Sequence, residues 1–259
     1  MEVHAHTHTE RKEWTHYFWK FLMLFLAVFC GFLAEYQLEH KIEKERAKEL
    51  AENLYNEVYA DSIVIQQAIA NRITKEKSYA DFAAYIKDSN LVKPGMRFYL
   101  SFSNAFVNHR PLIFEPKDGI LNQLINSGSL RYFRNKQLQT DIGLLSVAIG
   151  KIRSRVLREN TFLDFTLRPF QMKHFDNRWL SLVTDKGTIT VADAIEKNDV
   201  SQYPSPRILH LQQFDKDEAE NIALQGIIMS SGTRLIVFKE YADANHSLLM
   251  TLRKEYHLK

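Results

Sequence analysis

The stretch Phe21 to Ala34 reads FLMLFLAVFCGFLA and contains no charged side chain. It is shorter than the roughly 20 apolar residues that a helix needs to cross the hydrocarbon core of a bilayer. Aromatic residues extend it from Trp14 on one side to Tyr36 on the other, and Trp and Tyr favour the headgroup level. Lys20 interrupts the extension, but a lysine near a helix end can place its ammonium group at the interface. The sequence therefore predicts a transmembrane helix over residues 14–36.

Two other interpretations of this stretch are a buried core helix and a cleaved signal peptide. A core helix would show a polar stripe, and 21–34 has none. A signal peptide needs small residues before its cleavage site, and Leu33-Ala34-Glu35-Tyr36 is poor for cleavage. Cys30-Gly31 resembles a lipoprotein site, but Phe29 stands where a small residue is needed. We therefore expect an uncleaved single-pass anchor.

The orientation of the anchor is less clearly encoded, because Lys and Arg occur on both sides of it. A short tail with basic residues before a first span usually stays in the cytoplasm. This favours an N-terminus inside and a C-terminal domain outside.

The composition limits the class of protein. Lys and Arg number 34 against 31 Asp and Glu, and a net charge of +3 gives no reason to propose nucleic acid as a partner. The one Cys lies in the apolar stretch, so no intrachain disulfide is possible. Only 9 Gly and 6 Pro punctuate the chain, which favours long helices. The nearest candidate for a second span, Ile222 to Phe238, is interrupted by polar residues.

The chain divides into a polar His-containing tail (1–13), the transmembrane helix (14–36), a charged helical stalk (37–52) and a helical domain (53–259). The first soluble helix should end near Asp88, and its apolar stripe continues to Ile73. A middle helix should begin at an Asn135 cap and run to Arg168, where Pro169 ends it. Its apolar residues alternate in steps of four and three, as in a coiled coil: Leu138, Ile142, Leu145, Ile149, Ile152 and Val156.

A last helix should open at Asp215, which begins a capping-box pattern. Its expected buried positions are Ile228, Leu235, Phe238, Ala242, Leu249, Leu252 and Tyr256, with Ser231 and Asn245 as polar interruptions. Shorter elements are a helix over 117–126 stopped by Gly128 and the stretch 98–107, which is ambiguous between helix and strand. The stretch 177–206 is the least regular, with a turn at 185–187, a short helix opened by 190–193 and a loop at 203–206. These elements predict an all-α protein in which a membrane anchor continues into a bundle of three long helices plus short helices.

Few residues point to chemistry. His4, His6 and His8 alternate, so an extended chain would place three imidazoles on one side, a pattern that suits Zn, Cu or Ni. No fourth ligand accompanies them, which favours a solvated tail and no committed metal site. Glu13-Trp-Thr-His16 matches the Glu-x-x-His of di-iron bundles, but those sites need two such motifs.

A basic stripe lies beside the apolar positions of the middle helix and comprises Lys151, Arg155 and Arg158, with Arg153 near it. It is either a solvated face or a contact for acidic headgroups or an acidic partner. The other histidines, His109, His174, His210, His246 and His257, are scattered and have no readable catalytic partner. The sequence contains no phosphate-binding glycine loop, nucleophile elbow or His-Glu-x-x-His motif. We therefore assign no catalytic, cofactor-binding or metal residues and expect no enzyme and no cofactor.

The N-terminal residues EVHAHTHTERK and WTHYFWKFLMLFLAVFCGFLAEYQLEH resemble those of uncharacterised single-pass membrane proteins of Bacteroidetes. The segment FEPKDGILNQLINSGSLRYFRNKQL resembles a looser pattern in the same group. The resemblance implies a bacterial inner-membrane protein with a helical, periplasmic domain, and it carries no functional residues.

Three functions remain open at this point. The first is a membrane-anchored interaction or scaffold module that binds another envelope protein or itself. The second is a ligand-sensing ectodomain that works with a separate signalling partner. The third is metal handling through the N-terminal histidines.

Overall fold

The computed structural model describes residues 14–92, 94–107, 113–183 and 206–258. The chain separates into two units, Met1–Ala51 and Glu52–Lys259. The described residues form helices and connecting turns, without a strand. In order, the elements are α1 (Trp14–Asp88), α2 (Met96–Phe102), η1 (Ser103–Val107), α3 (Gly119–Asn126), η2 (Ser129–Tyr132), α4 (Lys136–Phe162), η3 (Leu163–Leu167), α5 (Arg168–His174), α6 (Asn177–Val183), η5 (Leu211–Gln213), α8 (Lys216–Gly232), η6 (Thr233–Phe238) and α9 (Lys239–Tyr256).

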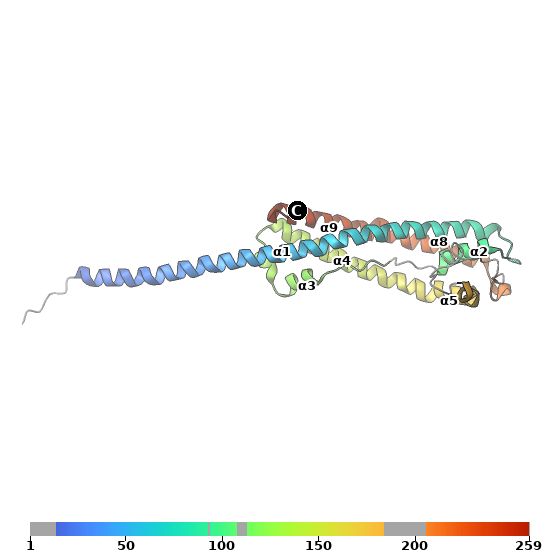
Figure 1. Ribbon diagram of the computed structural model, residues 1–259, viewed down its shortest axis with the longest axis horizontal. Helices are drawn as coiled ribbons and strands as arrows, with labels where there is room; N and C mark the ends of the chain where they lie inside the picture. The colour runs from blue at the N-terminus through green and yellow to red at the C-terminus, as the bar shows by residue number, and fades with distance from the viewer. Residues whose placement is uncertain (1–13, 93, 108–112, 184–205, 259) are drawn as a thin grey trace, which may run out of the picture. The chain divides into compact units, whose positions relative to one another are not determined.

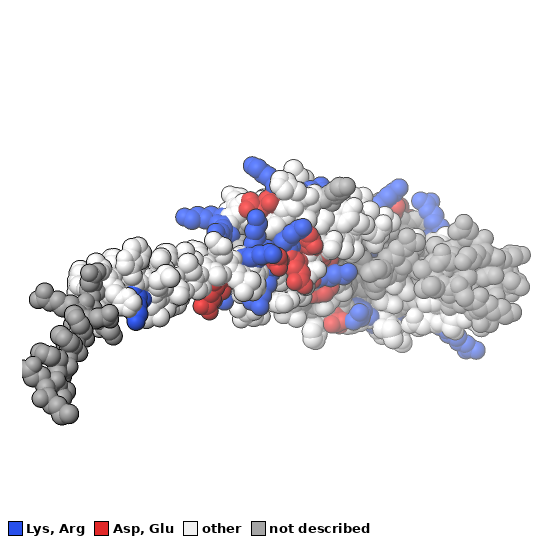
Figure 2. Space-filling view, turned by 60° about the vertical axis from the view of Figure 1, so that its left-hand side comes forward, with Lys and Arg blue, Asp and Glu red and all other residues white. Residues whose placement is uncertain are grey.

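The first unit contains the N-terminal part of α1. Its apolar residues from Phe21 to Ala34 lie almost entirely exposed, and Figure 2 shows a surface nearly free of charge there. This helix is long and apolar enough to cross a membrane, and no part of its most apolar window is buried. The stretch Lys216–Tyr256 passes the same criterion of length and composition, but a third of its apolar window is buried inside the protein.

In the second unit, the C-terminal part of α1 runs beside α4 and the α8–η6–α9 stretch (Figure 1). The α4 positions predicted to be buried are buried from Leu138 to Ile152, and Val156 is half-buried. The α9 side contributes Phe238, Leu248, Leu249 and Leu252 to the core. A helix with apolar residues at steps of three and four presents one continuous stripe to its neighbours, which explains this pairing.

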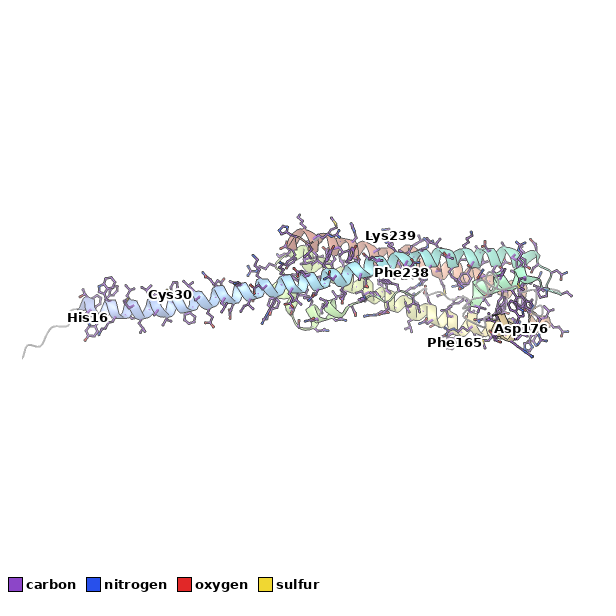
Figure 3. The ribbon with its side chains drawn as sticks, in the orientation of Figure 1. His16, Cys30, Phe165, Asp176, Phe238 and Lys239 are labelled. Carbon is purple, nitrogen blue, oxygen red and sulfur yellow. The ribbon has the colours of Figure 1, made fainter. Side chains whose placement is uncertain are left out.

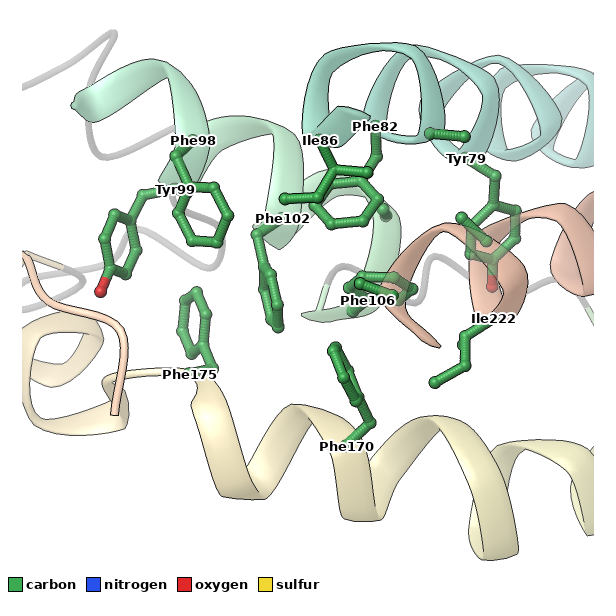
Figure 4. Close-up of a cluster of buried hydrophobic side chains, with 14 of the residues drawn as sticks. Tyr79, Phe82, Ile86, Phe98, Tyr99, Phe102, Phe106, Phe170, Phe175 and Ile222 are labelled. Carbon is green, nitrogen blue, oxygen red and sulfur yellow. The ribbon is translucent and has the colours of Figure 1, made fainter. Parts of the chain in front are cut away.

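An aromatic cluster fills the end of this unit where α1 stops (Figure 4). Phe82 of α1 meets Phe106 of η1 edge-to-face, with ring centroids 4.7 Å apart. Phe102 stacks on Phe175 at 5.4 Å, so α2 is joined to the end of α5. The stretch 98–107, ambiguous in the sequence, is therefore helical, and its aromatic residues form the core of this end.

Two short π-helical segments, η3 and η6, each connect two α-helices, and a third, η1, directly follows α2. A π turn inserts one extra residue and shifts the helix face that follows it. The expected buried positions were placed with one α-helical spacing across η6, so the positions before and within the π turn are out of register with those after it, and Ile228 and Leu235 are exposed. Before η6, α8 instead buries small residues, namely Ala219, Ala223, Gly226 and Ser230.

Two further expectations are wrong for related reasons. Pro169 does not end the middle helix, because η3 precedes it and Pro169 lies in the first turn of α5. A proline in a first helical turn loses no intrahelical hydrogen bond. On α1, Ile73 is half-exposed and its neighbour Arg72 is buried in its place.

The predicted helix ends agree with the structure. Helix α1 ends at Asp88, and Gly128 adopts the left-handed conformation after α3, with φ 68°. Asn135 caps α4 by accepting from the amides of Gln137 and Leu138. Asp215 caps α8 in the same way. The turn at 185–187 and the helix at 190–193 lie outside the described residues, as does the loop at 203–206 apart from its last residue.

Candidate functional site: a buried charge cluster

The most polar part of the interior is a group of charged side chains between α1, α4 and η6. We call it the charge cluster, and it comprises Arg72, Glu76, Arg155, Glu159, Ser230, Thr233 and Arg234. All of these residues belong to the unit Glu52–Lys259. The residues come from three helical stretches far apart in sequence, so the tertiary structure brings them together.

Arg72 and Glu159 form the centre of the charge cluster. The two Nη atoms of Arg72 donate to the two carboxylate oxygens of Glu159 at 3.0 and 2.7 Å. The guanidinium also lies over the ring of Phe238, 4.7 Å from its centroid. Only 1% of the Arg72 side chain and 12% of the Glu159 side chain are exposed. A two-pronged, charge-assisted pair of this kind fixes geometry as well as energy.

A second pair lies one helical turn further along α1. The guanidinium of Arg234 donates to both oxygens of Glu76, at 3.0 and 2.7 Å. The Ser230 hydroxyl donates to the same carboxylate at 3.1 Å. Because of these bonds, the pKa of Arg234 is raised above its ordinary value. Arg72 and Glu76 are four residues apart, which places both on one face of α1.

The π turn η6 connects the two pairs. Thr233 donates its hydroxyl to Glu159 and also lies 2.9 Å from the carbonyl oxygen of Met229. Arg234, the next residue, points to Glu76. Arg155 completes this side by donating to Thr233 at 2.7 Å and to the Met229 carbonyl at 2.8 Å. Adjacent residues of η6 therefore contact both ion pairs: Thr233 hydrogen-bonds Glu159, and Arg234 pairs with Glu76.

Lys75 lies beside the charge cluster on α1 and is 5% exposed. Its ammonium group donates to the carbonyl of Asn104 at 2.8 Å and lies over the Tyr79 ring. Burial disfavours the charged form and lowers the pKa of Lys75 to about 7. Lys75 therefore changes its charge near neutral pH, which ordinary lysines do not do.

Two carboxylates of α1 hold the segment around α3. Asp61 accepts from the amide of Lys117 at 2.7 Å and from the hydroxyl of Tyr241 at 2.9 Å. Glu57 accepts from the amide of Ile120, at the free N-terminal end of α3. Burial raises the pKa of Asp61 above its ordinary value, although both hydrogen bonds oppose that rise. These bonds are structural, since each carboxylate is occupied by backbone or buried hydroxyl donors.

A half-open groove of about 240 Å³ separates α1 from α9. Apolar Ile65 and Leu249 line it together with polar Gln66, His246 and Arg253. Arg253 also donates to the Tyr55 hydroxyl at 2.9 Å. The volume lies below the 300–1,000 Å³ typical of drug-sized ligand sites, so the groove suits at most a small molecule.

Most side chains of the predicted basic stripe bind other residues of the same chain. Lys151 pairs with Glu240, and Arg153 pairs with Glu115 and Asp118. Arg155 belongs to the charge cluster. Arg155 is therefore used inside the protein, whereas Lys151 and Arg153 stay about half exposed in surface ion pairs, and the contact of this stripe with acidic groups stays a prediction.

The scattered histidines do not converge. His174 packs in the aromatic cluster and hydrogen-bonds the carbonyl of Leu209, His246 lines the groove, and His210 and His257 take left-handed backbone conformations. Burial lowers the pKa of His174. Among the described residues, no three His, Cys, Asp or Glu side chains could hold a metal ion together. His109 and the tail residues 1–13 lie outside the described residues.

Sequence reasoning did not single out the charge cluster, apart from Arg155. One signal was present: Arg72/Glu76 and Arg155/Glu159 are both oppositely charged pairs at a spacing of four, next to apolar stripes. Such pairs normally lie on solvated helix faces, so the spacing alone does not indicate burial. No protein-family model, curated protein or solved structure matches the chain.

Proposed function

We propose that the protein is a membrane-anchored helical interaction module without a catalytic role. The exposed apolar stretch of α1 would lie in the bilayer, and the unit Glu52–Lys259 would form a helical bundle that binds an envelope protein or a second copy of itself. The resemblance noted above favours a bacterial inner membrane with this unit in the periplasm. The charge cluster supports the proposal, because its carboxylates are occupied by arginine, serine and threonine donors and serve to hold helices together.

The observation that carries the proposal is a row of exposed apolar side chains on α4, η3 and α5. Leu157, Phe165 and Met172 are 69, 80 and 64% exposed. They lie eight and seven residues apart along the helical stretch α4–η3–α5. Phe165 lies on the outer edge of this stretch (Figure 3). Exposed apolar side chains that gather into one surface are typical of protein contact sites, and we infer that these three are part of such a surface.

Two experiments test the proposal. Carbonate washing of membranes should leave the protein in the pellet with residues 1–13 still attached, and recovery in the soluble fraction would contradict the anchor. A photo-crosslinking amino acid at Phe165 should then capture a protein in intact cells. The same probe at Thr140, an exposed polar position on α4, is the matched control. Equal crosslinking at the two positions, or none at Phe165, would contradict the interaction surface.

A second candidate function is ligand sensing through the groove between α1 and α9. The mixed polar and apolar lining of this groove and the cationic Arg253 favour a small molecule with an acidic group. Thermal unfolding in a panel of small carboxylates and phosphate esters tests it. A stabilisation that Arg253→Gln removes would favour sensing over a purely structural module.

A further inference from the structure

A small cavity lies beside the charge cluster, in the angle between α1, α4 and α8. Its volume is about 40 Å³, and Arg72, Tyr79, Glu159, Gly226 and Ser230 belong to its lining. One water needs roughly 10–15 Å³ of such space, so the cavity has room for a few waters or one monatomic ion. Its walls are tightly packed, since a methyl group on Gly226 would come within 2.7 Å of the Tyr79 ring.

Two hydrogen-bond donors line this cavity and lack an acceptor among the described residues. The Nε of Arg72 is buried without a partner there, although both Nη atoms are paired with Glu159. The hydroxyl of Tyr79, which also lines the cavity, has no hydrogen bond to a described residue, but unlike Arg72 Nε it is not fully shielded from solvent. A buried donor without an acceptor costs about 1–3 kcal/mol. The Nε of Arg72 therefore requires an acceptor, and the Tyr79 hydroxyl is a second donor available to it.

The charges around the cavity favour a negative acceptor over a neutral one. The charge cluster holds three guanidinium groups, Arg72, Arg155 and Arg234, against the two carboxylates of Glu76 and Glu159. One positive charge is in excess in a half-open, partly buried place, where electrostatic interactions are stronger than in bulk water. Glu159 also lines the cavity, but arginine and threonine donors occupy its oxygens.

We propose that this cavity binds a small monovalent anion of halide size, held by the Nε–H of Arg72 and the O–H of Tyr79. The ion balances the excess charge and satisfies both donors. It also joins α1 to the α4 and α8 residues that line the same cavity. Chloride is the most abundant anion of this size and is the probe for the test.

The test is thermal unfolding of the detergent-solubilised full-length protein as sodium chloride replaces sodium gluconate at constant ionic strength. A ligand that binds only the folded state stabilises it increasingly with concentration, so the melting temperature should rise with chloride. Gluconate is too large for the cavity and serves as the reference. Equal melting temperatures in the two salts would overturn the proposal and assign the cavity to water.

Two variants locate the effect. Tyr79→Phe removes one donor without changing the ring and should abolish the chloride-dependent rise. Tyr99→Phe is the control, because the Tyr99 hydroxyl is buried without a described partner and Tyr99 does not line this cavity. A rise that persists in Tyr79→Phe, or that disappears equally in Tyr99→Phe, would overturn the site.

Chlorine NMR line broadening on the wild-type protein provides a second measurement if Tyr79→Phe does not fold. Broadening that bromide reverses and gluconate does not reverse supports the proposal. Absence of broadening overturns it.

Discussion

Glu159→Gln should be one of the most destabilising single substitutions in this protein. The change removes the charge that faces Arg72 and leaves a guanidinium buried to 99% beside a neutral amide. Breaking a buried, hydrogen-bonded ion pair by removing one partner costs roughly 3–5 kcal/mol, because the other charge stays desolvated. For a unit of this size that corresponds to a fall in melting temperature on the order of 10 °C.

A surface ion pair between α4 and α9 provides the control. Lys151 of α4 and Glu240 of α9 are 2.7 Å apart, but their side chains are 54 and 44% exposed. Exposed pairs contribute at most about 1 kcal/mol, so Glu240→Gln should change the melting temperature by only a few degrees. Replacing both members of the buried pair, as Arg72→Met with Glu159→Leu, should recover most of the stability that Glu159→Gln loses.

The assay is thermal unfolding of the solubilised full-length protein, followed by helical circular dichroism. If Glu159→Gln costs no more than Glu240→Gln, the charge cluster is solvated and the burial argument is wrong. If the double replacement is as unstable as Glu159→Gln, the two charges are not energetically coupled. Both results would also weaken the anion proposal, which depends on a desolvated cluster.

Three further outcomes follow from the structure. Ile149→Asp should cost several kcal/mol because Ile149 is buried, whereas Val147→Asp, at an exposed site two residues away, should cost little, and equal melting temperatures would mean a wrong register. The free energy of unfolding should rise as the pH increases from about 7 towards 10.5. Folding lowers the pKa of Lys75, so the unfolded chain binds more protons than the folded protein in this window. An unchanged pH profile in Lys75→Met would refute this. Replacing the three histidines of 1–13 by Ala should leave the melting temperature unchanged with or without zinc, and a zinc-dependent rise in the wild type alone would favour metal handling.

The helix ends were predictable because capping is local. Asn135 and Asp215 each accept amide bonds from residues two and three positions later, and Gly128 takes a backbone conformation that few other residues adopt easily. The apolar stretch 21–34 was predictable for the same reason, because its character depends only on consecutive residues in the sequence. These features depend on neighbours in the sequence, so the sequence contains them.

The interior of α8 and the charge cluster were not predictable in this way. A π turn changes which face of a helix is buried, and the spacing rule that placed Ile228 and Leu235 inside assumes an unbroken α-helix. The residues of Leu163–Leu167 and Thr233–Phe238 show no local pattern that predicts a π turn. We attribute these π turns to packing against other helices.

By itself, the sequence determined an all-helical chain, the apolar helix near its N-terminus and the residues at which most long helices begin or end. Only the tertiary structure decided that Arg72 would be buried and Ile73 exposed. The physical reason is that an arginine is costly to desolvate, and the carboxylate of Glu159, supplied from 87 residues away, offsets much of that cost. Local sequence patterns predict where a helix forms and ends. Whether a charged side chain can be buried depends on a partner that is distant in the sequence and close only in the fold.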